Sequence, residues 1–497
     1  MFVSPTPNSR PIDQGSTPTI RWLARSASML ALCALSVTAN AQTPAQAGHA
    51  APAHSPPAPA ATGHAVGPMA AGQAHAPAHH APVQGAPAAY SAPVAAAAAA
   101  PTTGLMATKL ELGGFVKADF IYNSASRATF GGGEDLFEFQ TLPGAIPTTD
   151  ADDGGANMTF NPRETRIWMT ATTPTELGDV IGYIEFDFYS VSPRNALGNE
   201  RLTNSALGRL RVARVNFKGF HIGMDWTSFM YHPARPEKVD LGSPAFRIFI
   251  RQNMLRYGGS LGENASYNVA LETPETTIFN HMGFGASAAG LREAAGMVVP
   301  DQDRLPDVMG QINYELDKFK FSVMGIAREL RINAGPMMES TAIAFGGQIG
   351  IRIDTIGKSN FRLRAAAGPG LGRYVANNAY AGAYLAPNGD LKPINIWGFT
   401  ASYQQWLTDT IRLNISPSYS AALNNPDVAD PAFMSYAGMN KSLLSMHTNI
   451  IWNVTKKWYV GIEHVFAQRQ REAGPGTAAA DAEGTLHRVF GSTRFKF

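Results

Sequence analysis

Hydrophobic and polar residues alternate along the chain from residue 109 to the C-terminus. In the first stretch, Leu110 and Leu112 share one parity, whereas Glu111 and Lys117 share the other. A period of two residues predicts β-strands with one apolar face and one polar face.

The alternation predicts sixteen strands. Their predicted spans are 109–122, 158–173, 179–190, 209–218, 220–229, 246–258, 265–273, 306–316, 319–329, 342–354, 360–374, 394–406, 410–420, 441–454, 457–469 and 485–497. In the fourth, Arg209, Arg211 and Arg214 do not share one parity, so we predict a β-bulge there.

The connections between these strands alternate between long and short. Residues 123–157, 191–208, 273–305 and 421–440 are long, whereas 174–178, 218–220, 317–318 and 455–456 are tight. Transmembrane barrels have short periplasmic turns, longer outer loops and an even number of strands. We therefore predict an all-β fold, a sixteen-stranded antiparallel transmembrane β-barrel of the porin type. Such a sheet must close because lipid offers no partner to backbone N–H and C=O groups.

Aromatic residues near the strand ends are typical of the interfacial girdles of such barrels. They are Tyr122, Tyr257, Trp397, Tyr403, Trp452 and Trp458. The chain ends in Phe497, with apolar residues at alternate preceding positions, and this resembles the recognition signal of bacterial outer-membrane proteins.

The first 106 residues have a different pattern. Arg21 and Arg25 precede an apolar run, residues 27–37, which ends at the small-residue site 39–41. This pattern predicts a secretory signal peptide over residues 1–41, too short in its apolar part to cross a bilayer. Residues 42–106 are rich in Ala, Pro and His and are predicted to be a disordered linker, with 107–497 forming the barrel. The linker histidines fit either a spacer or transient metal capture, and no regular spacing favours the latter.

Composition and charge exclude several classes of protein. Forty basic residues against 38 acidic ones give a net charge of +2, so we expect no nucleic-acid partner. The single cysteine, Cys33, lies inside the predicted signal peptide, which leaves the mature chain without disulfides or thiol chemistry. We expect no cofactor, and no catalytic or metal site is assigned. Calcium binding at Asp150, Asp152 and Asp153 is the alternative to a solvated acidic loop.

Short motifs spread over most of residues 109–497 resemble those of the DcaP-like outer-membrane porin family. The motifs are LGGFVKAD (112–119), RETRI (163–167), TPTELG (173–178), EFDF (185–188), GMDWTSF (223–229), LPDV (305–308), AREL (327–330) and GLGRY (370–374). The resemblance implies a homotrimer of sixteen-stranded barrels in the outer membrane of a Gram-negative bacterium, in contact with outer-membrane lipid and lipopolysaccharide. It also implies the passage of small anionic solutes, with dicarboxylates such as succinate and phthalate as the substrate class. Family members often carry a coiled-coil segment after the signal peptide, whereas this chain has the Pro- and His-rich linker, so a trimer clasp at that place is not expected.

Many arginines fall on the polar parity, where they would face the lumen. Arginine offers a planar fork that matches a carboxylate, and rings of Arg and Lys favour anions in pores. The candidate pore-lining residues on strands are Lys117, Arg166, Arg256, Arg328, Arg352, Arg362, Arg364 and Arg412. The alternative is that wall carboxylates such as Glu185, Asp354 and Glu463 neutralise them and only stiffen the wall.

The connection between the fifth and sixth predicted strands, which is the third outer loop, adds two candidates, Arg235 and Lys238. It covers roughly residues 230–245. In sixteen-stranded porins this loop folds inward and narrows the pore, so we expect both side chains to lie beside the strand arginines.

Three other functions remain open from the sequence. An outer-membrane enzyme of the lipase or protease kind would need a pair such as Ser445 and His447, for which no orienting carboxylate is evident. A structural or adhesive barrel would have a plugged lumen. A porin for phosphate or sugar would share the same wall pattern. The porin for small anions is the function that the arginine-rich polar face and the resemblance favour.

Overall fold

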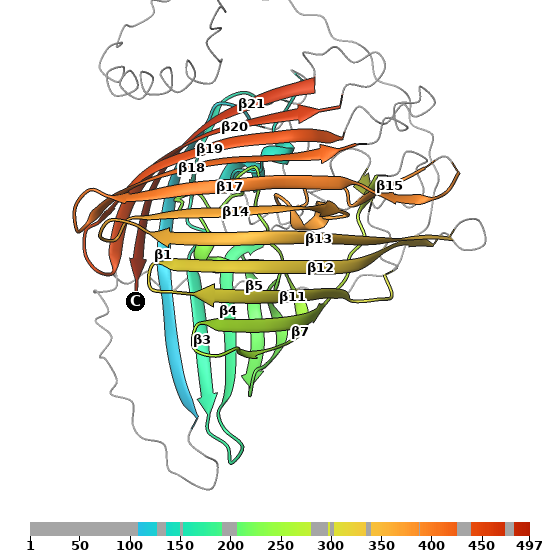
Figure 1. The fold of residues 1–497 in the computed structure, drawn as a ribbon. Coiled ribbons are helices and arrows are strands. Elements are labelled where there is room, and N and C mark those ends of the chain that lie inside the picture. The colour runs from blue at the N-terminus through green and yellow to red at the C-terminus, as the bar shows by residue number, and fades with distance from the viewer. Residues whose placement is uncertain are drawn as a thin grey trace, which may run out of the picture. The chain divides into compact units, whose positions relative to one another are not determined.

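The computed structural model describes residues 108–126, 136–149, 153–190, 206–279, 297–298, 303–333, 339–386, 388–424, 439–472 and 482–497. The predicted signal peptide, the linker, and Asp150 and Asp152 of the acidic loop lie outside this part of the chain. The regular secondary structure of the described residues is almost all β-strand (Figure 1). Within them, the helices are too short to cross a bilayer.

Seventeen strands form the main sheet, and every neighbouring pair in it is antiparallel. They are β1 (Lys109–Asn123), β2 (Asn157–Asn161), β3 (Arg166–Thr173), β4 (Val180–Ser190), β5 (Leu207–Phe217), β6 (Phe220–Trp226), β7 (Arg251–Ser260), β8 (Ala265–Glu272), β11 (Asp307–Glu315), β12 (Phe319–Asn333), β13 (Glu339–Asp354), β14 (Asn360–Pro369), β17 (Asn395–Trp406), β18 (Ile411–Leu423), β19 (Asn440–Asn453), β20 (Trp458–Arg471) and β21 (Glu483–Lys496).

Short elements occupy the loops. A small four-stranded sheet, which the sequence pattern did not predict, contains β9 (Ile278–Phe279), β10 (Met297–Val298), β15 (Ala383–Leu385) and β16 (Leu391–Pro393). The helical turns are α2 (Leu136–Phe139), η1 (Pro143–Ala145), η2 (His232–Ala234) and η4 (Gly372–Tyr374).

The sheet closes on itself through the pairing of its first and last strands. Strand β21 pairs with β1 from Phe115 opposite Lys496 to Asn123 opposite Arg488. On its other edge, β1 pairs with β3 and then with β2. These two strands therefore lie end to end and count as one strand of the barrel. The predicted closed barrel of sixteen antiparallel strands is therefore confirmed.

The predicted strand 158–173 is wrong in one respect, because it is interrupted between β2 and β3. Pro162 has no N–H to donate to the ladder, and the Thr165 amide donates back to the Pro162 carbonyl at 3.0 Å. The chain makes a turn at this point. The turn buries Arg163 and Glu164, and Glu164 reaches Lys117 on β1.

The predicted bulge in β5 is confirmed. The register between β4 and β5 shifts between Glu185 and Phe186, opposite Arg211. The extra residue lets Arg209, Arg211 and Arg214 all meet carboxylates inside the wall, despite their mixed parity.

Three other predicted strand boundaries are wrong for a common reason. Strand β6 ends at Trp226 rather than at 229, β7 begins at Arg251 rather than at 246, and β14 ends at Pro369 rather than at 374. In each case the apolar residues beyond the strand belong to a loop that packs inside the barrel, so alternation alone could not separate them from the strand.

The outer face of the barrel is apolar and carries the predicted aromatic residues. Tyr122, Tyr257, Trp397, Tyr403, Trp452 and Trp458 are all exposed, together with many Leu, Ile, Val and Phe side chains. An exposed apolar band is what a lipid-facing surface requires.

Part of the lumen is filled by an apolar core that the sequence pattern did not predict. Phe246 and Ile248 from the loop after β6, and Tyr374 and Tyr380 from the loop after β14, pack against inward wall residues such as Met324. A second cluster joins the loop after β1 to the wall near β20 and β21. These loops therefore narrow the water-filled space to one side of the barrel.

We expect the substitution Ile312→Arg to destabilise the folded barrel by about 2–4 kcal/mol, because it places a charge near the middle of the apolar outer band. Unfolding by denaturant in lipid vesicles measures this loss. The matched control is Leu177→Arg in the turn between β3 and β4, where a charge is expected to cost about 0–1 kcal/mol. An equal loss in both variants would contradict the assignment of this face to lipid.

Candidate functional site

The loop that connects β6 to β7, residues 227–250 and called here the inner loop, extends across the lumen. Its backbone is bonded to serine side chains on the opposite wall. The Phe246 amide donates to Ser418 Oγ on β18 at 2.7 Å, and the Ala245 amide donates to Ser445 Oγ on β19 at 2.9 Å. The inward fold predicted for this loop is thus observed, and small polar residues on the wall hold it.

A second set of contacts fixes the middle of the inner loop. The Val239 amide donates to Glu463 on β20, and the Val239 carbonyl accepts from Lys117 Nζ on β1 at 2.8 Å. At Gly242 a side chain would not fit, because a Cβ there would lie 2.2 Å from the Thr141 amide nitrogen. The loop after β1 therefore packs directly on the inner loop and presses it against the wall.

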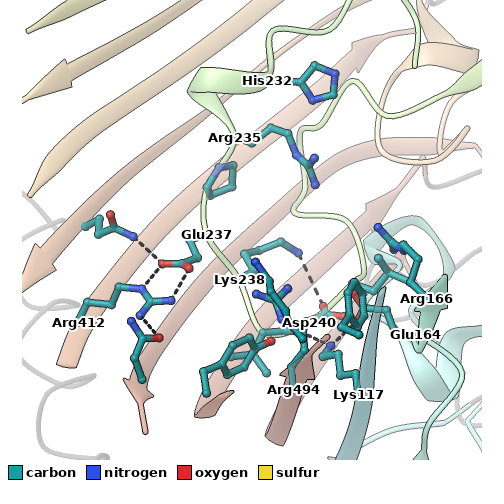
Figure 2. Close-up of a pocket in the computed structure, with 18 of the residues that line it drawn as sticks. Lys117, Glu164, Arg166, His232, Arg235, Glu237, Lys238, Asp240, Arg412 and Arg494 are labelled. Atoms are coloured by element: carbon teal, nitrogen blue, oxygen red, sulfur yellow. Dashed lines mark hydrogen bonds and ion pairs between the residues drawn. The ribbon is translucent and has the colours of Figure 1, made fainter. Parts of the chain in front are cut away.

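A cavity of about 1030 Å³ lies between the inner loop and the inward face of the wall (Figure 2). Fourteen lysines and arginines line it, against four carboxylates. The basic residues are Lys117, Arg166, Arg211, Arg235, Lys238, Arg247, Arg352, Lys358, Arg362, Arg412, Lys456, Lys457, Arg494 and Lys496, and the acidic ones are Glu164, Glu185, Glu237 and Asp240. We call this space the basic cavity.

Glu237 ties the inner loop to β18. Its carboxylate accepts two hydrogen bonds from the Arg412 guanidinium, at 2.6 and 2.7 Å (Figure 2). Burial alone would raise the pKa of Glu237, but the bonds from Arg412 hold it below its ordinary value. A two-pronged pair of this kind fixes both position and orientation of the loop.

Lys117 performs the same role on the other side of the lumen. Its buried ammonium donates to Glu164 in the turn between β2 and β3, and lies 3.2 Å from Asp119. Since it also donates to the Val239 carbonyl, Lys117 is neutralised by the wall and serves mainly to position the inner loop.

The arginines of β3 and β5 share too few carboxylates to be neutralised completely. Arg211 donates to Glu185 at 2.6 Å and to Asp187 at 2.6 Å, while Arg166 lies 3.5 Å from the same oxygen of Glu185. Asp187 also accepts two bonds from Arg209. Three guanidinium groups thus meet two carboxylates, which leaves a positive excess on this side of the basic cavity.

Arg235 and Arg247 add positive charge from the inner loop. Among the described residues, no carboxylate pairs with Arg235, whose guanidinium lies 5.9 Å from the Phe249 ring centre. Burial and the neighbouring Arg166 and Arg211 lower the pKa of Arg235 to about 10, so it stays charged at neutral pH. Arg247 donates to the Gly242 carbonyl at 2.5 Å, and its Nε and Nη2 atoms are buried without a hydrogen-bond partner.

Two further groups of the inner loop have shifted pKa values. Burial lowers the pKa of Lys238 to about 8, although Asp240 opposes the shift. Burial and then Arg235 lower the pKa of His232 to about 4, so this imidazole is neutral at neutral pH. Lys238 is therefore the inner-loop group whose charge changes just above neutrality.

Seven of the ten predicted site residues line the basic cavity. They are Lys117, Arg166, Arg235, Lys238, Arg352, Arg362 and Arg412. Arg352 pairs with Asp354 at 2.8 Å, and Arg362 donates to the Arg235 carbonyl at 2.6 Å.

The other three predicted residues lie away from that lining. Arg256 donates to His221 at 2.8 Å, and Arg328 is buried against Asp307 at 3.2 Å. Arg364 is buried, and its Nε and Nη1 atoms have no hydrogen-bond partner among the described residues.

The sequence prediction missed several residues of the lining. Arg211 changes parity at the bulge, and Arg247 lies in a segment that was predicted to be strand. Lys456 and Lys457 belong to a tight turn, where a parity argument does not apply. A count of cations at the turns and in the inner loop would have found most of them.

Ser445 and His447, the pair that the enzyme alternative would need, are buried under the inner loop. The sequence offered no orienting carboxylate, but the structure provides one, since His447 Nδ1 lies 2.9 Å from Glu463 on β20. Ser445 Oγ instead accepts from the Ala245 amide, so its bond goes to the inner loop. Asp240, His447 and Glu463 together form a buried group of potential metal ligands.

Comparisons with known proteins agree with this architecture. The sequence profile of a family described as a porin subfamily matches residues 108–485. The fold resembles the crystal structure of the outer-membrane channel DcaP of Acinetobacter baumannii, with a TM-score of 0.61 and 15% identity, covering 80% of this chain and 100% of that one. The anion-selective porin from Comamonas acidovorans aligns with a TM-score of 0.45 and 9% identity, over 79% of this chain and 100% of that one.

A search of curated protein sequences finds no significant match. The family match covers most of the chain and the whole described barrel up to β21, and the closed barrel with an inner loop has the same fold as DcaP. The chain belongs to the porin subfamily, and its fold resembles that of the outer-membrane channel DcaP.

Proposed function

We propose that this porin passes small anions, with dicarboxylates as the solute class. The observation that supports this proposal is the lining of the basic cavity, which contains fourteen lysines and arginines and only four carboxylates. A water-filled space lined mainly by one sign of charge concentrates ions of the opposite sign. Rings of arginine and lysine favour anions in pores for the same reason.

The carboxylates of the cavity support the proposal by their positions. Glu237 pairs with Arg412 and so ties the inner loop to the wall. Glu164 pairs with Lys117, which in turn holds the inner loop. The remaining excess comes from Arg166, Arg211, Arg235 and the lysines near the turns. We infer that the paired cations position the loop and that the excess cations attract the solute.

The preference for dicarboxylates rests on the type of cation. Guanidinium groups from the inner loop and from several strands face the same space, and each offers a planar fork suited to a carboxylate. A solute with two carboxylates can contact two of them at once. The DcaP-like family supports the same class, with succinate as a simple member. Guanidinium forks match phosphate as well as carboxylate, so the family resemblance and not the forks favours dicarboxylates over phosphate.

We further propose the cellular setting. Residues 1–41 act as a signal peptide, residues 42–106 form a linker, and the barrel inserts as a homotrimer in an outer membrane, in contact with lipid and lipopolysaccharide. The family and the apolar outer band support this setting, and the Ala39-Asn40-Ala41 site gives the cleavage position.

A barrel with a plugged lumen is the second candidate, because the apolar cores under the inner loop and the loop after β1 fill part of the interior. We expect proteoliposomes containing the purified protein to swell in isotonic succinate, because the basic cavity lies beside these cores. Protein-free liposomes are the control. No swelling in succinate, or in any small solute, would favour the plugged barrel over the porin.

We expect the double substitution Arg166→Gln and Arg235→Gln to lower the ratio of anion to cation permeability. Removal of a charge about 4–8 Å from the solute path in water changes the energy of the anion by about 0.5–1 kcal/mol, so the ratio should fall about two- to sixfold for each residue. The reversal potential of single channels in a salt gradient measures this ratio. The control is Arg256→Gln, which lies outside the lining of the basic cavity and should leave the reversal potential unchanged. Equal shifts in both variants would show that the selectivity does not reside in the basic cavity.

We expect the preference for anions to fall as the pH rises from 7 to 9. The pKa of Lys238 is lowered to about 8, so the ammonium is about 90% charged at pH 7 and about 10% at pH 9. Lys238→Met should give the lower preference at both pH values, while Lys238→Arg should keep the higher preference at both. A pH response that persists in Lys238→Met would assign the titration to another group.

A further inference from the structure

A buried group of three side chains lies where the inner loop meets the wall. Asp240 comes from the inner loop, His447 from β19 and Glu463 from β20. One potential ligand atom from each lies within 4.8 Å of those of the other two, and all three residues are buried. The group thus joins three segments that are far apart in the sequence.

The imidazole of His447 has one nitrogen engaged and one without a partner. Its Nδ1 lies 2.9 Å from Glu463 Oε1, so Nδ1–H donates to this carboxylate and Nε2 keeps its lone pair. Nε2 is buried and has no hydrogen-bond partner among the residues that the structure describes. A buried acceptor without a partner is unfavourable, which is a reason to look for a missing ligand. A carboxylate that orients a histidine in this way is the usual support of a metal-bound imidazole.

The two carboxylates retain capacity for a cation. Asp240 accepts from the Gly242 amide at 2.6 Å and from the Thr141 amide at 3.3 and 3.4 Å. Glu463 accepts from the Val239 amide, from Asn449 Nδ2 at 3.0 Å and from His447 Nδ1 at 2.9 Å. Each ionised carboxylate has about four lone-pair positions, so each keeps about one for a cation. Asp240 also belongs to the lining of the basic cavity, so the group lies next to this space.

Lys238 is the cation that competes for this position. Its Nζ lies 4.0 Å from Asp240 Oδ2 and donates to the Gly242 carbonyl at 2.5 Å (Figure 2). With a neutral imidazole, two carboxylates and one ammonium leave one negative charge in the group. Arg488 also acts on Asp240 from further away, and it too opposes the binding of a cation.

We propose that Asp240 and His447, supported by Glu463, form a binding site for a divalent transition-metal ion, with Zn²⁺ as the best match to an imidazole and a carboxylate. The ion is held by His447 and Asp240, with Glu463 orienting the imidazole and balancing the charge, and water completes its coordination. Because Asp240 lies on the inner loop and His447 on the wall, the bound ion crosslinks the loop to β19. This crosslink holds the inner loop in place across the lumen, independently of which solute the pore passes.

The experiment uses the full chain, purified in detergent and freed of metal with a chelator. Titration calorimetry with ZnSO₄ counts the bound ions, and Co²⁺ absorption reports their coordination. The wild type should bind one more ion per chain than His447→Gln, and should show a Co²⁺ band that Asp240→Asn and His447→Gln both lose. Zn²⁺ should also raise the midpoint of thermal unfolding in the wild type and not in these variants.

Two matched variants separate this site from the other histidines. His464→Gln removes a histidine from the outer face of the same strand, β20, and should keep the extra ion and the thermal shift. Lys238→Met removes the competing cation and should tighten Zn²⁺ binding at least tenfold. Circular dichroism confirms that each variant folds.

Two results would overturn the proposal. One is equal Zn²⁺ stoichiometry in the wild type and in folded His447→Gln, which would assign all binding to the linker and outer-face histidines. The other is the absence of a Co²⁺ band in both the wild type and Lys238→Met, which would show that the group is closed to metal ions even without the competing cation.

Discussion

The whole molecule depends on the need of every backbone N–H and C=O group for a partner inside lipid. The pairing of β1 with β21 meets this need by removing both free edges of the sheet. Once the sheet is closed, alternate residues must face either lipid or the lumen, so the polar face is forced inward. The break between β2 and β3 and the bulge in β5 are local adjustments within that constraint, and both direct charged side chains into the interior.

The charged residues of the inward face fall into two groups, those that hold the inner loop and those that give the basic cavity its charge. Some charges are paired and hold the inner loop, as Glu237 does with Arg412 and Glu463 with the Val239 amide. Others, such as Arg235, have no carboxylate partner among the described residues and leave the basic cavity with an excess of positive charge. A loop held by fixed bonds on several strands keeps these cations in position, which a mobile loop could not do.

The interior of the barrel contains an apolar part and a polar part. Aromatic residues of the loops after β6 and β14 bury their rings against inward apolar wall residues, such as Met309 and Met324. Burial of this apolar surface stabilises the loops inside the barrel and removes part of the lumen from water. The wet part is consequently displaced to the side where β1, β3, β5, β18 and β21 carry their charges.

The sequence by itself determined the fold. Its period-two alternation follows from the local geometry of a β-strand, and its long and short connections and aromatic strand ends follow from the position of a barrel in lipid. It identified five residues of the cavity lining through parity, which holds wherever a strand is regular, and two more, Arg235 and Lys238, through the inward fold expected of the loop. It did not determine where Pro162 ends β2, where loops such as 227–250 replace strand, or which apolar residues pack inside the barrel. Nor did it bring Asp240, His447 and Glu463 together, or distinguish the paired Arg412 from the unpaired Arg235. Those features depend on contacts between segments far apart in the chain, and only the closed barrel with its inner loop in place brings such segments within bonding distance.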